Sequence, residues 1–421
     1  MTLNKQSGDK YKPYIIIFSI AIIVYGLIYL FTGNFFITAS NPYNSYSRQA
    51  AAWLSGQLDL GENVPWLELA VFNGKYYVSF PPFPSIVLLP FVLIFGISTP
   101  DNTIAFIISL LSLFYAYKLG YKVLRNKWHS VFLSLFLILG TNYLHVSLWG
   151  SVWYIAQNMA FLFTLIAFYY ALSYNSKHSF IALFAMCAAM GCRPFNALYL
   201  PLVLYLIFLR ENKSFVSYLK NVLIYSIPAF VLGVFFMWLN YARFGSIFEF
   251  GHNYLPEFLS DPHGQFYAGR ILANLERIFF NFDIFEFPMF HGFAFWVASP
   301  IVVSFIIYLG LYIVKSVRGT VLVTPCQRDG SCDTKSAKYI VIGILVLTMA
   351  HILLFSLHRT LGGHQFGSRY TVDTLPAFYL GLLLLVNSLK IKNSIYFNAV
   401  PMLFGFVLNF YGTVQFMSYY Y

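Results

Sequence analysis

The sequence predicts an all-α polytopic membrane protein with about eleven transmembrane helices and further short helices in its first extracytoplasmic loop. Hydrophobic residues make up 59% of its 421 residues and charged residues only 10%, whereas a soluble domain carries about 25% charged residues. Apolar stretches long enough to cross a bilayer recur along the whole chain. The net charge is +11, but the basic residues fall in short clusters between those stretches. This is typical of cytoplasmic loops and excludes nucleic acid as a partner.

Each predicted span is an apolar run of roughly 17–25 residues, or two helices that share a longer run. The run 179–210 is interrupted by Gly191, Cys192, Arg193 and Pro194, and we interpret it as two short helices that meet near the outer surface. The whole chain, 1–421, then forms a single integral membrane domain. The other spans are predicted at 14–36, 103–120, 129–147, 152–173, 221–239, 293–314, 338–357, 374–389 and 394–412.

One apolar run, 83–97, decides the orientation of everything that follows it. It is short, is preceded by Pro81 and Pro82, and ends at Gly96. If it does not cross the bilayer, 18 of the 26 basic residues lie on the side of the N-terminus, and if it does cross, only 9 do. Cytoplasmic loops are enriched in Lys and Arg, so we predict that 83–97 is an interfacial or re-entrant helix and that the N-terminus is cytoplasmic.

This orientation places three long segments outside the membrane, at 37–102, 240–292 and 358–373, together with a shorter one at 142–158 that carries two tryptophans. The main cytoplasmic loop is 315–338. Seven of the eight outer basic residues are Arg, whereas 14 of the 18 inner ones are Lys, and 11 of the 15 acidic residues are outside. Outer arginines indicate pairing with carboxylates or phosphates, so the outer face is predicted to carry the function.

The first outer segment has three local signals. Alanines and Trp53 recur at helical spacing between Tyr46 and Gly56, which predicts an amphipathic helix on the membrane surface. Asn73-Gly74 predicts a hairpin turn. Pro81-Pro82 predicts an extended return toward the bilayer.

Five motifs follow one another along the outer segments: YSRQA from Tyr46 to Ala50, GKYYVSFPPFPSIVLLPFVLIFG at 74–96, Arg193-Pro194, NYARFGSIFEFGHNY at 240–254 and FGSRYTVDTLP at 366–376. In this order they resemble the GT-C superfamily of membrane glycosyltransferases, the class that includes protein mannosyltransferases and lipid A aminoarabinose transferases. The resemblance spans about residues 10–380 and implies a GT-C-like fold.

The resemblance also implies a reaction, which is transfer of a sugar from a polyprenyl-phosphate carrier to a glycan, lipid or protein acceptor outside a bacterial plasma membrane. Membrane lipids and the lipid-linked sugar are then its partners. Arginines can bind the donor phosphate, a carboxylate can take the proton of the acceptor hydroxyl, and aromatic side chains can contact sugar and prenyl groups. Some members use a divalent metal and others do not. The outer acids here follow no metal-ligand spacing, so no metal-binding residues are predicted.

Two positions depart from the family pattern. An Asp usually follows the first span, but here the chain has Asn41 and Asn44, and the Lys that usually precedes Pro-Pro is Phe80. Either the base is another outer acid, or the chain is a non-catalytic relative. Glu68 lies inside the apolar run WLELAV, where desolvation raises the pKa of a carboxylate, and it is our first candidate. Asp59 is the second, although its DLGE surroundings are also typical of a turn.

The remaining candidates are substrate-binding residues that match the family motifs or lie beside them. Arg369, His364 and Arg193 are candidates for the donor phosphate. The others are Lys75, Tyr76, Tyr46, Glu249, Arg243 and Tyr370.

Two other functions fit a polytopic protein with this outer face. A transporter or flippase of lipid-linked saccharides would place polar residues at mid-bilayer and show internal repeats, and neither is evident in the sequence. A non-catalytic protein of an envelope assembly would account for the missing Asp.

Overall fold

The computed structural model describes residues 3–32, 38–173, 175–211, 214–286, 289–318, 334–391 and 394–420. It is an all-α polytopic membrane protein, as predicted. In this described part, eight helical segments are long and apolar enough to cross a membrane. They contain α1 (Leu3–Thr32), α4 (Asp101–Leu124), α7 (Val152–Ala171), α9 (Leu200–Glu211, preceded by the 3-10 turn η3, Pro194–Tyr199), α11 (Ile227–Phe244), α16 (Thr334–Ser356), α17 (Leu375–Leu389, preceded by the 3-10 turn η6, Arg369–Thr374) and α18 (Ser394–Tyr420).

Three more of the predicted spans are helices of 13 to 17 residues: α5 (Lys127–Leu139), α8 (His178–Cys192) and α15 (Ile301–Val317). At 1.5 Å per residue, α5 is about 20 Å long, less than the hydrocarbon core of about 30 Å. The run predicted at 129–147 is divided because the buried polar residues Thr141 and Asn142 follow Gly140, and a separate short helix, α6 (Tyr143–Val146), continues it.

One predicted helix break and one predicted span can be compared with the structure. Helix α8 ends at Cys192 and the next turn begins at Pro194, where the sequence predicted a break. The span predicted at 221–239 is instead displaced toward the C-terminus. Pro228 near its start separates α10 (Phe215–Tyr225) from α11, because proline is favoured in the first turn of a helix and disfavoured further inside.

The first outer segment has the predicted local structure. Helix α2 is Ser45–Leu54, and the hairpin pairs β1 (Leu69–Phe72) with β2 (Lys75–Val78). Asn73 and Gly74 both have positive φ, of 50° and 74°, as the two central residues of a type I′ turn require. Helix α3 (Phe83–Phe95) follows and packs against α2. The direction of α3 relative to a bilayer stays a prediction.

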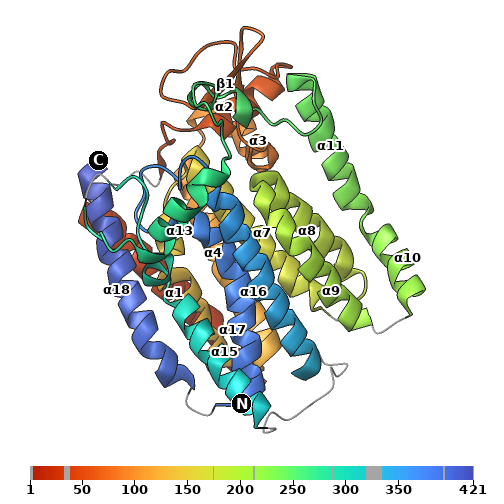
Figure 1. The fold of residues 1–421 in the computed structure, drawn as a ribbon. Coiled ribbons are helices and arrows are strands. Elements are labelled where there is room, and N and C mark those ends of the chain that lie inside the picture. The colour runs from red at the N-terminus through yellow and green to blue at the C-terminus, as the bar shows by residue number, and fades with distance from the viewer. Residues whose placement is uncertain are drawn as a thin grey trace.

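Figure 1 shows how these elements are arranged. Helix α2, the hairpin, α3 and the segment after α11 gather at one end of the bundle, while the N-terminal end of the chain lies at the other. The C-terminal end of α18 lies toward the first of these ends. Most of loop 315–338 is outside the described residues.

The core is centred on α7 and α17, whose apolar windows are 78% and 89% buried. Polar contacts cross this core: the Tyr379 hydroxyl of α17 donates to the Ala116 carbonyl of α4 at 2.9 Å. The start of α7 and the turn η6 before α17 therefore sit in a rigid setting at the end of the bundle where the outer segments meet.

Candidate active-site cavity

A cavity of about 760 Å³ lies where the segments predicted to be extracytoplasmic meet. Its walls come from α2, from the residues before β1, from the first turn of α7, from the start of η3, and from loops around 248–266 and 358–370. Seven of the candidates from the sequence line it: Tyr46, Glu68, Arg193, Glu249, His364, Arg369 and Tyr370. Segments more than 300 residues apart in the sequence, such as those of Tyr46 and Tyr370, thus contribute to one site.

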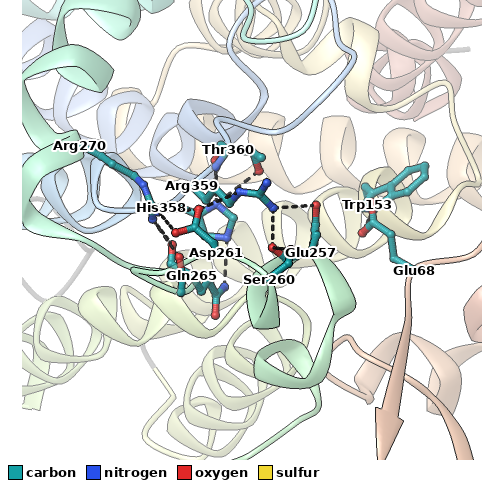
Figure 2. A network of polar contacts seen from close by, with 11 residues as sticks. Glu68, Trp153, Glu257, Ser260, Asp261, Gln265, Arg270, His358, Arg359 and Thr360 are labelled. Atoms are coloured by element: carbon teal, nitrogen blue, oxygen red, sulfur yellow. Dashed lines mark hydrogen bonds and ion pairs between the residues drawn. The ribbon is translucent and has the colours of Figure 1, made fainter.

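Glu68 is a half-buried carboxylate in this cavity. The indole N–H of Trp153, in the first turn of α7, donates to its Oε2 at 2.9 Å (Figure 2). Burial raises the pKa of Glu68, and the nearby Glu257 carboxylate raises it further, while the Trp153 hydrogen bond and the Arg369 charge oppose this shift. A carboxylate whose pKa is raised is better suited to accept a proton than an ordinary surface Glu.

Arg369 is a buried cation without a carboxylate partner in the described part of the chain; the residue is 3% exposed. Its Nη1 donates to the Trp153 carbonyl at 3.1 Å and its Nη2 to the Gly362 carbonyl at 2.6 Å. Its Nε–H has no partner. The guanidinium also lies 5.1 Å from the centre of the Tyr154 ring. A buried charge is normally paired, so this guanidinium is well suited to bind an anion in the cavity.

Arg193 is held differently. Its Nε is 3.0 Å from Oδ2 of Asp373, which is buried and also accepts a hydrogen bond from Gln157 of α7 at 2.9 Å. The Arg193 guanidinium lies 4.9 Å from the centre of the Tyr370 ring. Asp373 already compensates its charge, and the pair joins the end of α8 to η6.

The other predicted residues in the cavity are Tyr46, Tyr370, His364 and Glu249. Tyr46 is buried on α2, and its ring is tilted against that of Phe80 at 6.4 Å. The His364 ring contacts the Phe290 ring. Glu249 accepts hydrogen bonds from its own loop, at 2.6 Å from the backbone N–H of Gly251, which leaves it a local structural role as well.

Asp59, Lys75, Tyr76 and Arg243 do not line the cavity. Asp59 is paired with Lys75 at 2.9 Å and accepts a hydrogen bond from the Gly61 N–H, and the Lys75 contact lowers the pKa of Asp59. Asp59 therefore belongs to a turn, as its DLGE surroundings also suggested. Tyr76 lies on β2 beside this pair. Arg243 is buried, and it donates to the Val78 carbonyl and so ties α11 to the hairpin.

Sequence reasoning missed Glu257, which lies in a network of charged residues at the opposite wall (Figure 2). Arg359 lies 3.5 Å from Glu257 and 3.1 Å from Asp261. Arg270 contacts both carboxylate oxygens of Asp261 at 2.9 Å. Backbone hydrogen bonds also join the two loops, from Arg359 N to the Gln265 carbonyl at 2.9 Å. We call residues 256–267 with their partners at 357–360 the loop clasp.

Two histidines were also missed, His252 and His358, whose ring centres are 6.1 Å apart. The His252 Nδ1–H donates to the Ser79 carbonyl, and His358 Nε2 accepts from Gln265 at 3.0 Å, which fixes a neutral tautomer for each. Burial lowers the pKa of His252 to about 4 and that of His358 to about 3. Both are therefore neutral hydrogen-bonding groups at physiological pH.

The residues that depart from the family pattern have structural contacts. The Asn41 side chain accepts from the Tyr43 N–H, and the Asn44 side chain donates to the Ile97 carbonyl. Phe80 lines the cavity as an apolar wall. Among the described residues, no three His, Cys, Asp or Glu side chains come together as a metal site would require.

No family model and no curated protein matches this sequence. Among solved structures, the chain is similar to ArnT from Cupriavidus metallidurans bound to undecaprenyl phosphate, with 13% identity and a TM-score of 0.49 over 91% of this chain and 61% of that one. The apo state of ArnT from Cupriavidus metallidurans is 14% identical, with a TM-score of 0.47 over 91% of this chain and 61% of that one. The apo Archaeoglobus fulgidus oligosaccharyltransferase is 12% identical, with a TM-score of 0.43 over 94% of this chain and 56% of that one. ArnT, a lipid A aminoarabinose transferase, and the oligosaccharyltransferase are GT-C superfamily members. The chain spans less than two thirds of the length of these proteins.

Proposed function

We propose that this protein is a membrane glycosyltransferase of the bacterial plasma membrane that transfers a sugar from a polyprenyl-phosphate-linked donor to an extracytoplasmic acceptor. The observation that carries the proposal is that one cavity holds both the buried Arg369 guanidinium, which has no carboxylate partner among the described residues, and the half-buried Glu68 carboxylate. The two are linked by Trp153, whose indole bonds Glu68 and whose carbonyl bonds Arg369.

Arg369 fits the donor phosphate. A guanidinium binds phosphate oxygens with strong charge-assisted hydrogen bonds, and Arg369 lines the cavity with a buried Nε–H that has no hydrogen-bond partner. Negative charge grows on the phosphate as the sugar leaves, so the same contact becomes stronger in the transition state and stabilises it. Arg193, which also lines the cavity, can add to the positive potential.

Glu68 fits the general base. In the transfer, a bond forms between the acceptor oxygen and the anomeric carbon, and the bond from that carbon to the phosphate oxygen breaks. Glu68 accepts the proton of the acceptor hydroxyl, and the polyprenyl phosphate leaves with the electron pair. A positioned base of this kind contributes about 10²- to 10⁴-fold to a rate.

The rest of the lining suits a lipid-linked sugar. Trp149, Trp153, Tyr154 and Phe416 form one wall and Phe248, Phe250 and Phe266 another, and aromatic faces pack well against sugar rings and prenyl chains. Carboxylates and neutral histidines between them can accept hydrogen bonds from hydroxyl groups.

A binding experiment tests the first half of the proposal. Purified protein in neutral detergent is titrated with a polyprenyl phosphate and with the matching polyprenol, which lacks the phosphate. We expect Arg369→Gln to weaken binding of the phosphate by at least about tenfold, while the control Arg277→Gln, an exposed arginine on α13 (Ile271–Phe280), leaves it unchanged. Equal binding by Arg369→Gln and wild type would contradict the assignment.

Transfer is tested with a polyprenyl-phosphate sugar in liposomes. The proposal requires cleavage of the sugar–phosphate bond, seen as release of free polyprenyl phosphate. A flippase would instead move the intact molecule across the bilayer, and a scaffold protein would do neither.

A further inference from the structure

A second, smaller cavity of about 140 Å³ lies far from the candidate active site. Its lining comes from α1, α4 and α7, and consists of Tyr14, Tyr117, Lys118, Tyr121, Lys122, Arg125 and Tyr169. Helix α4 begins beside α2, where Asp101 accepts a hydrogen bond from Ser47, and its 24 residues make it about 36 Å long. The small cavity is at the far end of this helix, so we call it the basic pocket.

Three cations converge on this pocket. Lys118 and Lys122 are four residues apart and share one face of α4, and Arg125 is the residue that directly follows the helix. The ammonium groups of Lys118 and Lys122 lie 4.8 and 4.6 Å from the centre of the Tyr169 ring, and are thus at most about 9.4 Å apart. Both lysines therefore fold over one ring at the pocket rather than extending away from each other.

No carboxylate of the described residues lies within ion-pair distance of these three cations. Glu211, at the same end of the bundle, is paired with Arg210 at 3.3 Å and accepts a hydrogen bond from Asn221. Lys122 donates to the Ser173 hydroxyl, a neutral acceptor. Like charges four residues apart on a helix destabilise it. An anion that binds between the cations would reduce the repulsion between them.

We propose that the basic pocket binds the phosphate group of an anionic membrane lipid. The lipid source is favoured over free phosphate by the surface beside the pocket: Ile15, next to Tyr14, is 62% exposed, and Ile22 and Ile23 continue an exposed apolar row along α1. Acyl chains can lie along this row while the phosphate reaches the cations. Basic pockets between transmembrane helices bind such headgroups in other membrane proteins. This inference is independent of the proposed transferase activity.

The test uses delipidated protein in neutral detergent with added phosphatidylglycerol, and reads out native mass spectrometry and the thermal unfolding midpoint. We expect Lys118→Gln/Lys122→Gln to weaken lipid binding by roughly 30-fold and to abolish the rise in midpoint that the lipid gives the wild type. The control Lys177→Gln/Lys220→Gln removes the same charge from two exposed lysines outside the pocket and should behave as wild type.

Without anions, the pocket variant should be at least as stable as the wild type, because it removes a repulsion. Arg125→Gln, at the exposed end of the pocket, should cause a smaller loss of lipid binding and serves if the double variant does not fold. Equal loss of binding in the pocket and control variants would overturn the proposal, since it would mean diffuse attraction to the membrane surface. A rise in midpoint with inorganic phosphate as large as that with lipid would overturn the lipid assignment.

Discussion

The indole N–H of Trp153 donates a 2.9 Å hydrogen bond to the Glu68 carboxylate. The same tryptophan accepts a hydrogen bond from Arg369 at its backbone carbonyl. One residue in the first turn of α7 therefore positions both the proposed base and the proposed phosphate-binding group, and several predictions about the cavity depend on it.

Glu68→Gln should lower the rate of sugar transfer by about 10²- to 10⁴-fold, because the amide cannot accept the acceptor proton. Asp59→Asn is the matched control, since it makes the same chemical change in the Lys75 ion pair outside the cavity. Both variants should keep a wild-type unfolding midpoint, and the rate is measured as release of polyprenyl phosphate. Full activity in Glu68→Gln would show that another carboxylate is the base.

Trp153→Phe should move the acidic limb of the pH–rate profile to higher pH. A base works only when deprotonated, so activity is lost as the pH falls through the pKa of Glu68. The Trp153 hydrogen bond lowers that pKa, and its removal raises it by about 0.7 unit if the bond contributes ~1 kcal/mol. Trp66→Phe, which loses an exposed indole hydrogen bond to the Pro42 carbonyl, should leave the profile unchanged. A shift to lower pH would contradict the role of Glu68.

Asp373→Asn should reduce the stability of the protein by about 3 kcal/mol or more. The substitution leaves Arg193, whose side chain is 23% exposed, without its charge partner, while position 373 stays buried at 1% side-chain exposure. The thermal unfolding midpoint in detergent measures the effect. The Asp59→Asn variant provides the comparison, because exposed ion pairs contribute little. An unchanged midpoint would mean that Arg193 finds another anion, such as the bound donor.

Arg359→Gln should open the loop clasp with little change in overall stability. Arg359 is partly exposed and contacts both Glu257 and Asp261, and such pairs contribute about 1 kcal/mol or less. Asp261 keeps its contact with Arg270. We expect faster amide hydrogen exchange across residues 256–267 than in the wild type, with unchanged exchange in α7. Exchange unchanged in the loop would show that the backbone hydrogen bonds alone hold it.

Gly367→Ala should prevent normal folding. Gly367 has a φ of +76°, and an added Cβ would lie 2.1 Å from the Asn142 Oδ1. Asn142 is buried and donates to the Phe366 carbonyl at 2.9 Å, so it cannot move away. Gly264→Ala has a similar φ of +62° with no atom within 4 Å of the added group, and it should cost only about 1 kcal/mol. Expression level and unfolding midpoint distinguish the two.

Local patterns predicted the local structure well. Helix α2, the Asn73-Gly74 hairpin and the break before Pro194 each depend on residues adjacent in the sequence, whose backbone preferences act over a few positions. Apolar runs likewise predicted the helices, because the bilayer imposes their composition. The length of α5 was not predictable in this way, since it depends on where Asn142 finds its buried partners.

The site was predictable only in part. Glu68 and Arg369 stood out because each lies in a recognisable setting, an apolar run and a family motif. The sequence alone could not exclude Asp59 as a candidate. Its partner Lys75 comes close only when the loop before β1 folds back on β2, where the Leu60 N–H donates to the Tyr76 carbonyl. Glu257 was missed because it lies at the cavity only when two loops that are distant in the sequence pair with each other.

The link between Arg369 and Trp153 joins positions 216 residues apart, and this has a consequence for biosynthesis. When α7 is first inserted, Glu68 and Trp153 can already meet, but the guanidinium that completes the site is still to be synthesised. The nascent protein therefore holds Glu68 and Trp153 without Arg369 until η6 emerges and docks against α7. On the proposed function, affinity for an anionic donor arises late in assembly, and a ribosome stalled before residue 369 leaves a membrane-embedded intermediate that lacks the proposed phosphate-binding arginine.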